Sequence, residues 1–157
     1  MILVLHNIRS MHNVGSIFRT ADAAGIEKIY LCGITPSPLN EFKKYRPQIS
    51  KVALGAEKTV PWEKCGPTWR LLDKLKEDSY TIFAIEQHER SIPYNKVRLA
   101  RSEKKKSALV LGHEIKGLSQ GVLKRCDRIL EIPMAGEKES LNVSVAFGIV
   151  IFSLINN

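Results

Sequence analysis

The sequence predicts an α/β domain in which helices flank a mostly parallel sheet. Short apolar runs without a helical period alternate along the chain with segments that have one. This alternation is typical of parallel sheets, because each return to a parallel strand takes a crossover connection. The length of 157 residues suits one domain, at about 150 residues per domain. Ligands of such sheets bind beyond the carboxyl ends of the strands, so we expect the functional residues in the segments that follow strands.

The short apolar runs are predicted to be strands because they lack the 3.6-residue period of a helix. They occupy residues 2–6, 28–32, 59–62, 80–85, 108–111 and 129–132. A long loop is expected at residues 33–47, which contain three prolines and several lysines and arginines.

The segments with a helical period are predicted to be helices, and they occupy residues 13–24, 69–76, 119–125 and 142–155. In the first of them Val14, Ile17 and Phe18 share one face, and a glycine ends it. The second carries three leucines at helical spacing. Asn13 and Ser119 are the residue types that cap helix N-termini, so we expect them to begin the first and third helices. The last helix is apolar almost throughout and is expected to be buried.

The charge of the chain points to a polyanionic partner. Twenty-four lysines and arginines against sixteen aspartates and glutamates leave a net charge of +8. Such an excess on one small domain favours nucleic acid as the partner. A basic enzyme whose charge serves only solubility is the alternative that composition leaves open.

Cysteines and termini exclude several protein classes. Cys32, Cys65 and Cys126 are odd in number and widely spaced, which is unlike a disulfide framework or a zinc cluster. His113 and Glu114 are adjacent, a spacing that does not present two ligands to one metal. The apolar stretch at 143–155 is shorter than the roughly 20 residues that cross a bilayer. We therefore expect a cytoplasmic protein with no metal site and no membrane segment.

Familiar nucleotide and hydrolase motifs are absent or out of context. The chain has neither G-x-G-x-x-G nor a Walker A motif. Residues 117–121 match the G-x-S-x-G nucleophile elbow around Ser119. All four histidines precede this serine, whereas the hydrolase order needs a histidine after it. A serine hydrolase therefore remains the weakest alternative, and a helix cap explains Ser119 more simply.

Three polar segments stand out together. They are Asn-Val-Gly-Ser-Ile-Phe-Arg at 13–19, Gly-His-Glu-Ile-Lys-Gly at 112–117, and Ile-Pro-Met at 132–134 followed by Ser-Leu-Asn-Val-Ser at 140–144. In this order they resemble the three motifs of the SpoU/TrmH-type ribose 2′-O-methyltransferases of the SPOUT superfamily. The resemblance spans nearly the whole chain, and the third motif is its most specific part.

The resemblance implies a C-terminal deep trefoil knot, S-adenosyl-L-methionine bound in the knotted region, and a homodimer built on the first and last helices. It also implies one catalytic domain over residues 1–157, here expected without a terminal RNA-binding extension. Apolar side chains and close backbone would surround the adenine. The implied cofactor-binding residues are Ile85, Leu111, Gly112, Gly117, Ile132, Pro133, Met134, Ser140 and Leu141, with Ile85 resting on topology alone.

The implied catalytic residues are Arg19, Asn13, Glu114, Ser140 and Asn142. A guanidinium keeps its charge near neutral pH. We therefore expect Arg19 to bind an RNA phosphate and to stabilise the 2′-alkoxide as it develops, while phosphate or water takes the proton. Asn13 would orient Arg19 or the ribose, and Glu114 and Asn142 would either contact substrate or support the loops.

The implied partner is RNA, with transfer RNA expected first and ribosomal RNA second. Phosphate contacts are expected from clustered basic side chains, which are Arg9, Lys43, Lys44, Arg46, Lys104, Lys105 and Lys106. A knotted dimer that binds RNA without catalysis is the main alternative from another class. The intact Arg19, Glu114 and Asn142 argue against that alternative.

Overall fold

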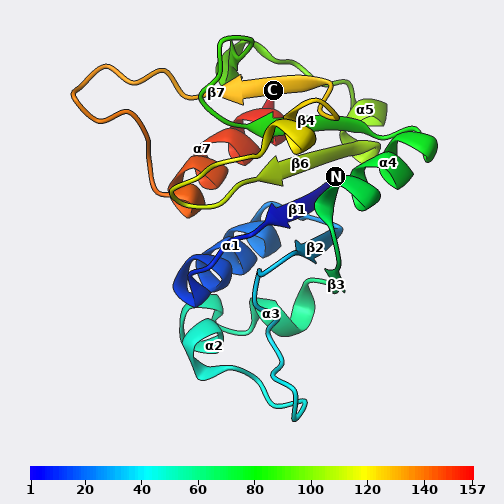
Figure 1. The fold of residues 1–157 in the computed structure, drawn as a ribbon, viewed down its shortest axis with the longest axis vertical. Helices are drawn as coiled ribbons and strands as arrows, with labels where there is room; N and C mark the ends of the chain where they lie inside the picture. The colour runs from blue at the N-terminus through cyan, green and yellow to red at the C-terminus, as the bar shows by residue number, and fades with distance from the viewer.

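One seven-stranded sheet forms the centre of the computed structural model, which describes all residues 1–157. The strand order is β3-β2-β1-β6-β4-β7-β5, and every neighbouring pair is parallel (Figure 1). This confirms the α/β prediction with a mostly parallel sheet. The strands are β1 (Ile2–His6), β2 (Lys28–Cys32), β3 (Trp62–Cys65), β4 (Thr81–Ile85), β5 (Ile92–Pro93), β6 (Ser107–Leu111) and β7 (Arg128–Glu131).

Helices cover both faces of the sheet. They are α1 (Met11–Ala23), α2 (Pro47–Ala53), α3 (Ala56–Thr59), α4 (Thr68–Glu77), the 3-10 helix η1 (Tyr94–Lys96), α5 (Arg101–Lys105), α6 (Gln120–Leu123) and α7 (Val143–Asn156). A core of 25 buried residues joins one face to α1, α2, α3 and α7. A second core of 13 buried residues joins the other face to α4 and α6. Because both faces are covered, the central strands read as continuous apolar runs.

The pleat explains how one strand supplies both cores. Along β1, Leu3 and Leu5 belong to the larger core, whereas Ile2 and Val4 belong to the smaller one. Successive side chains of a strand point to opposite faces, so this alternation is the expected one. All five residues of β6 are buried, as expected for the central strand of the sheet.

Two sequence predictions about elements were wrong. Residues 59–62 do not form a strand: α3 ends at Thr59, and β3 starts at Trp62 on the edge of the sheet. The half-exposed sequence of β3 lacks the apolar run that marks a buried strand. The N-cap of α1 is Ser10 and not Asn13, because the Ser10 hydroxyl accepts the Asn13 N–H at 3.2 Å. The sequence analysis did not predict α2, α3, β5, η1 and α5.

No helix of the structure is long and apolar enough to cross a membrane. The structure holds no group of three His, Cys, Asp or Glu side chains placed to bind a metal ion. The last helix is buried along one face only, since Val145 and Phe152 are 50% and 40% exposed.

Candidate functional site

The candidate site is a pocket beyond the carboxyl ends of β4, β6 and β7. Eight of the nine predicted cofactor-binding residues line it: Ile85, Leu111, Gly112, Gly117, Ile132, Met134, Ser140 and Leu141. The ninth, Pro133, is exposed and does not line the pocket. The loop from β7 to α7, orange in Figure 1, stands away from the sheet and carries the third motif.

Several residues that line the pocket were not predicted from the sequence. They are Glu86, Gln87, His113, Ile115, Lys116, Leu130, Glu131, Val143 and Ala146, besides the predicted Glu114. Glu86 and Gln87 directly follow β4, so its carboxyl end was the available signal. The Gln87 amide donates to the Ile132 carbonyl at 3.0 Å and ties the end of β4 to the end of β7.

The loop after β6 closes on itself so tightly that only glycine fits at its ends. A Cβ on Gly112 would lie 2.7 Å from the Gly117 carbonyl carbon and 2.8 Å from the Leu118 nitrogen. Gly117 has φ +63°, and a Cβ there would collide with the Glu86 carboxylate. That carboxylate accepts the Leu118 N–H at 2.8 Å. The glycines of this motif therefore permit close backbone packing against Glu86.

Glu114 fastens this loop to the start of α1. Its carboxylate accepts the backbone N–H groups of Ser10 at 2.9 Å and Arg9 at 3.1 Å, and the Asn13 side-chain amide at 3.3 Å. Burial alone raises the pKa of Glu114. The donated hydrogen bonds, those of Ser10 and Arg9 among them, outweigh burial, so the net pKa lies below its usual value. Glu114 is therefore a fixed anion and an anchor at neutral pH.

Asn13 passes the connection on to the third motif. Its side-chain oxygen accepts the Asn142 amide at 3.1 Å. Asn142 caps α7, since its own oxygen accepts the Ser144 N–H at 2.9 Å. Glu114, Asn13 and Asn142 thus form one hydrogen-bonded chain across residues that lie 101 and 129 positions apart in sequence. The three motifs, which are far apart in the sequence, therefore meet at one rim of the pocket.

Arg19 does not join this group within one chain. It is exposed on α1, makes no hydrogen bond or ion pair, and does not line the pocket. Ser140 lines the pocket from the exposed loop. Of the predicted catalytic residues, the structure therefore assembles four and leaves Arg19 on the outer surface.

The predicted RNA-binding residues fall into two groups. Arg9 follows β1, and Lys43, Lys44 and Arg46 lie in the segment that follows β2. Lys104, Lys105 and Lys106 precede β6 and therefore lie at the amino end of the sheet, away from the pocket. Figure 1 shows α5 at the opposite end of the sheet from the orange loop. Lys104 also donates to the carbonyls of Ile155 and Asn157 at the end of α7, at 2.9 and 3.0 Å.

The structure does not support the serine hydrolase alternative, because Ser119 has no histidine partner. Ser119 is exposed and shares a different pocket with His6. The ring nitrogens of His6 contact the Thr68 hydroxyl at 2.7 Å and the Asn7 amide at 3.3 Å. No histidine hydrogen-bonds to Ser119, so a Ser–His pair is not assembled.

Comparisons with known proteins agree with this geometry. Residues 1–152 match the model of the SpoU rRNA Methylase family. Over 154 residues the chain is 32% identical to the 23S rRNA (guanosine-2′-O-)-methyltransferase RlmB of Escherichia coli. The match covers 98% of this chain but 59% of that relative, so this chain spans well under two thirds of its length.

Two solved structures extend the comparison. An AdoMet-bound rRNA methyltransferase from Sinorhizobium meliloti aligns with a TM-score of 0.84 at 26% identity, covering 97% of this chain and 54% of that one. A structure described as giving insight into the 2-OH methylation of C/U34 on tRNA aligns with a TM-score of 0.77 at 26% identity. Here the match covers 96% of this chain and 90% of the other.

The family model thus spans almost all of the chain, and the three motifs that carry the resemblance meet at one pocket. This chain belongs to the SpoU rRNA Methylase family.

Proposed function

We propose that this chain transfers a methyl group from S-adenosyl-L-methionine to a ribose 2′-hydroxyl of RNA. The observation that carries the proposal is the Glu114–Asn13–Asn142 chain, which joins the three family motifs beside one pocket. The matched relatives are named as RNA methyltransferases, and one neighbour is titled as AdoMet-bound.

The lining of the pocket fits this cofactor. Ile85, Leu111 and Ile132 offer apolar surface for adenine, and the backbone of the loop after β6 comes close enough to read its edge. Glu86 and Glu131 add carboxylates, which favour a cationic sulfonium by simple Coulomb attraction. When bound, S-adenosylmethionine supplies an electrophilic methyl group, so the protein has to position and deprotonate only the hydroxyl.

The loop over the pocket has to adapt to the ligand. The pocket encloses about 190 Å³, whereas small-molecule sites usually hold roughly 300–1,000 Å³. Residues 135–141 are exposed and have no regular secondary structure. We therefore expect this segment to move outward when the cofactor enters.

Arg19 serves the reaction from a second copy of the chain. The outer face of α7 exposes Val145 and Phe152, and α1 packs beside α7. Two copies that bury this apolar face against each other bring Arg19 of one copy toward the pocket of the other. There the charged guanidinium binds an RNA phosphate and stabilises the developing alkoxide.

The chain segment from β7 to α7 completes the proposed trefoil knot. It leaves the sheet between β4 and β5 and returns across the larger core to pack α7 against α1. The resemblance to the SPOUT superfamily supports the knot, and two solved structures share the fold over 97% and 96% of this chain. A crystal structure would contradict the knot if its chain path became a straight line when the two ends were pulled apart.

Transfer RNA is the first proposed substrate and ribosomal RNA the second. The structure that concerns 2-OH methylation of C/U34 on tRNA is matched over 90% of its chain, whereas the match to the rRNA enzyme covers 59% of that relative. The basic residues Arg9, Lys43, Lys44 and Arg46 would contact phosphates near the pocket.

Transfer of tritiated methyl from S-adenosylmethionine to separate tRNA and rRNA pools tests the reaction. We expect label as 2′-O-methylnucleoside, chiefly in tRNA. Arg19→Ala should lower the rate by about 10²–10³-fold without changing cofactor affinity in calorimetry. Arg128→Ala, an exposed arginine at the amino end of β7, is the matched control and should keep full activity. Absence of both label and cofactor binding would favour the non-catalytic RNA-binding dimer.

Mixed dimers test whether the site is shared. Arg19→Ala and Asn142→Ala are each expected to be inactive alone. After unfolding and refolding together in equal amounts, they should regain roughly a quarter of the activity, because half of the dimers are mixed and each of these has one intact site. No recovery from dimers shown to be mixed would place Arg19 and the pocket in the same copy.

A further inference from the structure

A second pocket lies at the same edge of the sheet, beyond the carboxyl ends of β1, β2 and β3. It is lined by His6, Asn7, Gly33, Pro67, Thr68, Trp69, Ser119, Gly121, Val122 and Arg125. Its volume is about 550 Å³, well inside the range of roughly 300–1,000 Å³ usual for ligand sites. None of the three family motifs contributes to its lining, so the family resemblance gives it no role.

The lining has the chemistry of an anion site with an aromatic wall. It contains no aspartate or glutamate and includes one arginine. The Trp69 side chain is 44% exposed, which is unusual for so large an aromatic residue. The Arg125 and Arg70 guanidinium carbons lie 5.5 and 5.2 Å from the Trp69 ring centre. An exposed indole flanked by guanidinium groups is the combination on which unpaired nucleic-acid bases stack.

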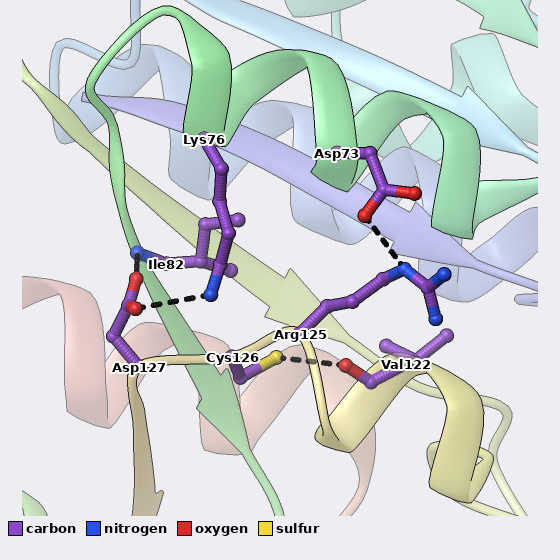
Figure 2. Close-up of polar contacts among 7 residues, drawn as sticks. All are labelled: Asp73, Lys76, Ile82, Val122, Arg125, Cys126 and Asp127. Atoms are coloured by element: carbon purple, nitrogen blue, oxygen red, sulfur yellow. Dashed lines mark hydrogen bonds and ion pairs between the residues drawn. The ribbon is translucent and has the colours of Figure 1, made fainter.

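Arg125 lies beside this wall, and Figure 2 shows its guanidinium paired with Asp73. Its Nε donates to the Asp73 carboxylate at 2.8 Å, and Nη1 donates to the Gly121 carbonyl at 2.8 Å. Its Nη2 makes no hydrogen bond within the chain and remains available to a ligand. Asp73 lies outside the lining of the pocket.

The opposite wall is also preorganised and polar. The His6 ring contacts the Thr68 hydroxyl at 2.7 Å, and the Asn7 oxygen accepts the Ile34 N–H at 3.0 Å. Burial lowers the pKa of His6, and the neighbouring His113 lowers it further. His6 therefore presents a neutral ring at neutral pH and fixes the wall without adding charge.

The two pockets share one connecting segment. Gly117 lines the first pocket, and Ser119, two residues later, lines the second. Successive nucleotides of one RNA strand can therefore reach both.

We propose that the second pocket binds an unpaired nucleotide of the substrate RNA, next to the nucleotide whose 2′-hydroxyl faces the cofactor in the first pocket. The base stacks on Trp69, and its phosphate accepts a hydrogen bond from Arg125 Nη2. This inference rests on the proposed function for the identity of the ligand as RNA. The second pocket would then determine which segment of the RNA strand is positioned for methylation.

Binding of a fluorescein-labelled 12-nucleotide adenine RNA to the full chain tests the proposal. In a Trp62→Phe background Trp69 is the sole remaining tryptophan, and the RNA should quench its fluorescence. Trp69→Ala should weaken binding between about 5- and 150-fold, as loss of base stacking does, whereas Trp69→Phe keeps most of the affinity. The same RNA annealed into a duplex should quench little.

Asp73 provides the matched control for Arg125. Arg125→Gln and Asp73→Asn both break the same ion pair, but only the first removes the cation. We expect Arg125→Gln to weaken RNA binding by about tenfold and to reduce its salt dependence. Asp73→Asn should not weaken it, because the Asn oxygen can still accept the Arg125 Nε–H. Equal weakening by both variants would reduce Arg125 to a structural role and overturn the proposal.

Two readouts keep this inference separate from the proposed function. Unchanged RNA affinity in Trp69→Ala, in a chain that transfers methyl groups, would overturn the second site alone. RNA binding through Trp69 by a chain that neither binds S-adenosylmethionine nor transfers methyl would overturn the proposed function alone. A parent chain that does not bind the RNA overturns the second site outright.

Discussion

The two pockets lie at one edge of one sheet, yet they differ in charge. The first includes Glu86, Glu114 and Glu131 among its lining residues, whereas the second has no carboxylate and one arginine. Electrostatic attraction therefore favours a sulfonium cation in the first and a phosphate in the second. Residues 112–117 line the first pocket and Ser119 lines the second, so only Leu118 lies between the proposed cofactor site and the proposed RNA site along this loop.

The pockets also differ in how firmly they are built. The first takes two of its lining residues, Ser140 and Leu141, from an exposed segment without regular structure. The second is framed by α4 and α6, which ion pairs hold to each other and to β7. Figure 2 shows Asp73 with Arg125, and Asp127 between Lys76 and the Ile82 N–H, which it accepts at 2.8 Å. A preformed site suits a strand that must be positioned, and an adaptable one suits a ligand that is enclosed.

Among the changes that contrast the two pockets, the largest effect is expected from adding one methyl group to the loop after β6. In Gly112→Ala the new Cβ would meet backbone atoms at 2.7 and 2.8 Å, so the loop has to shift. Overpacking of this kind costs about 1–3 kcal/mol. We expect S-adenosylmethionine affinity in calorimetry to fall by roughly 5- to 150-fold at that cost, while quenching of Trp69 by RNA persists.

Gly121 supplies the matched glycine in the second pocket. A Cβ there would have Ser119 Oγ as its nearest neighbour, at 4.0 Å. Gly121→Ala should therefore leave cofactor affinity unchanged. If Gly112→Ala weakened RNA binding as strongly as cofactor binding, the two pockets would be one site rather than two.

A smaller effect is expected from Glu114→Gln, which tests the anchor of the first pocket. The amide cannot accept all the N–H groups that the carboxylate accepts. Because the network is partly exposed, we expect a loss of about 1 kcal/mol, or a drop in Tm of roughly 2–4 °C. The exposed Glu137, changed to glutamine, serves as the control and should leave Tm unchanged.

The pH dependence of that effect follows from the lowered pKa of Glu114. A carboxylate with a depressed pKa stabilises the fold above its unfolded pKa of about 4.3. The stabilisation disappears as the pH falls through the lower folded value. Parent and Glu114→Gln should therefore differ in Tm at pH 7 and converge toward pH 3. A constant difference across that range would show that the charge of Glu114 has no part in the anchor.

The same contrast explains what the sequence could predict. The first pocket is built from contiguous motifs, so Gly112, Ile132 and Leu141 were found from their order along the chain. The second pocket takes its lining from four separate regions, at 6–7, 33, 67–69 and 119–125, and no local pattern marks such residues before the chain folds. The exposed place of Arg19 was equally hidden, because spacing along α1 does not tell which face a neighbouring helix will cover.

The smallest expected effect concerns His6, whose ring forms one wall of the second pocket. Burial and the neighbouring His113 lower its pKa, so the unfolded chain binds a proton below about pH 6.5 that the folded chain resists. Folding stability should therefore decrease as the pH falls below that value, and His6→Gln should remove this part of the decrease. Urea unfolding at pH 7 and 5.5 measures it, with an expected difference below about 1 kcal/mol. His12→Gln, an exposed histidine on α1, should follow the parent at both pH values. If His6→Gln also kept the pH dependence of the parent, burial would not hold the His6 ring neutral. The second pocket would then have no preformed wall at His6.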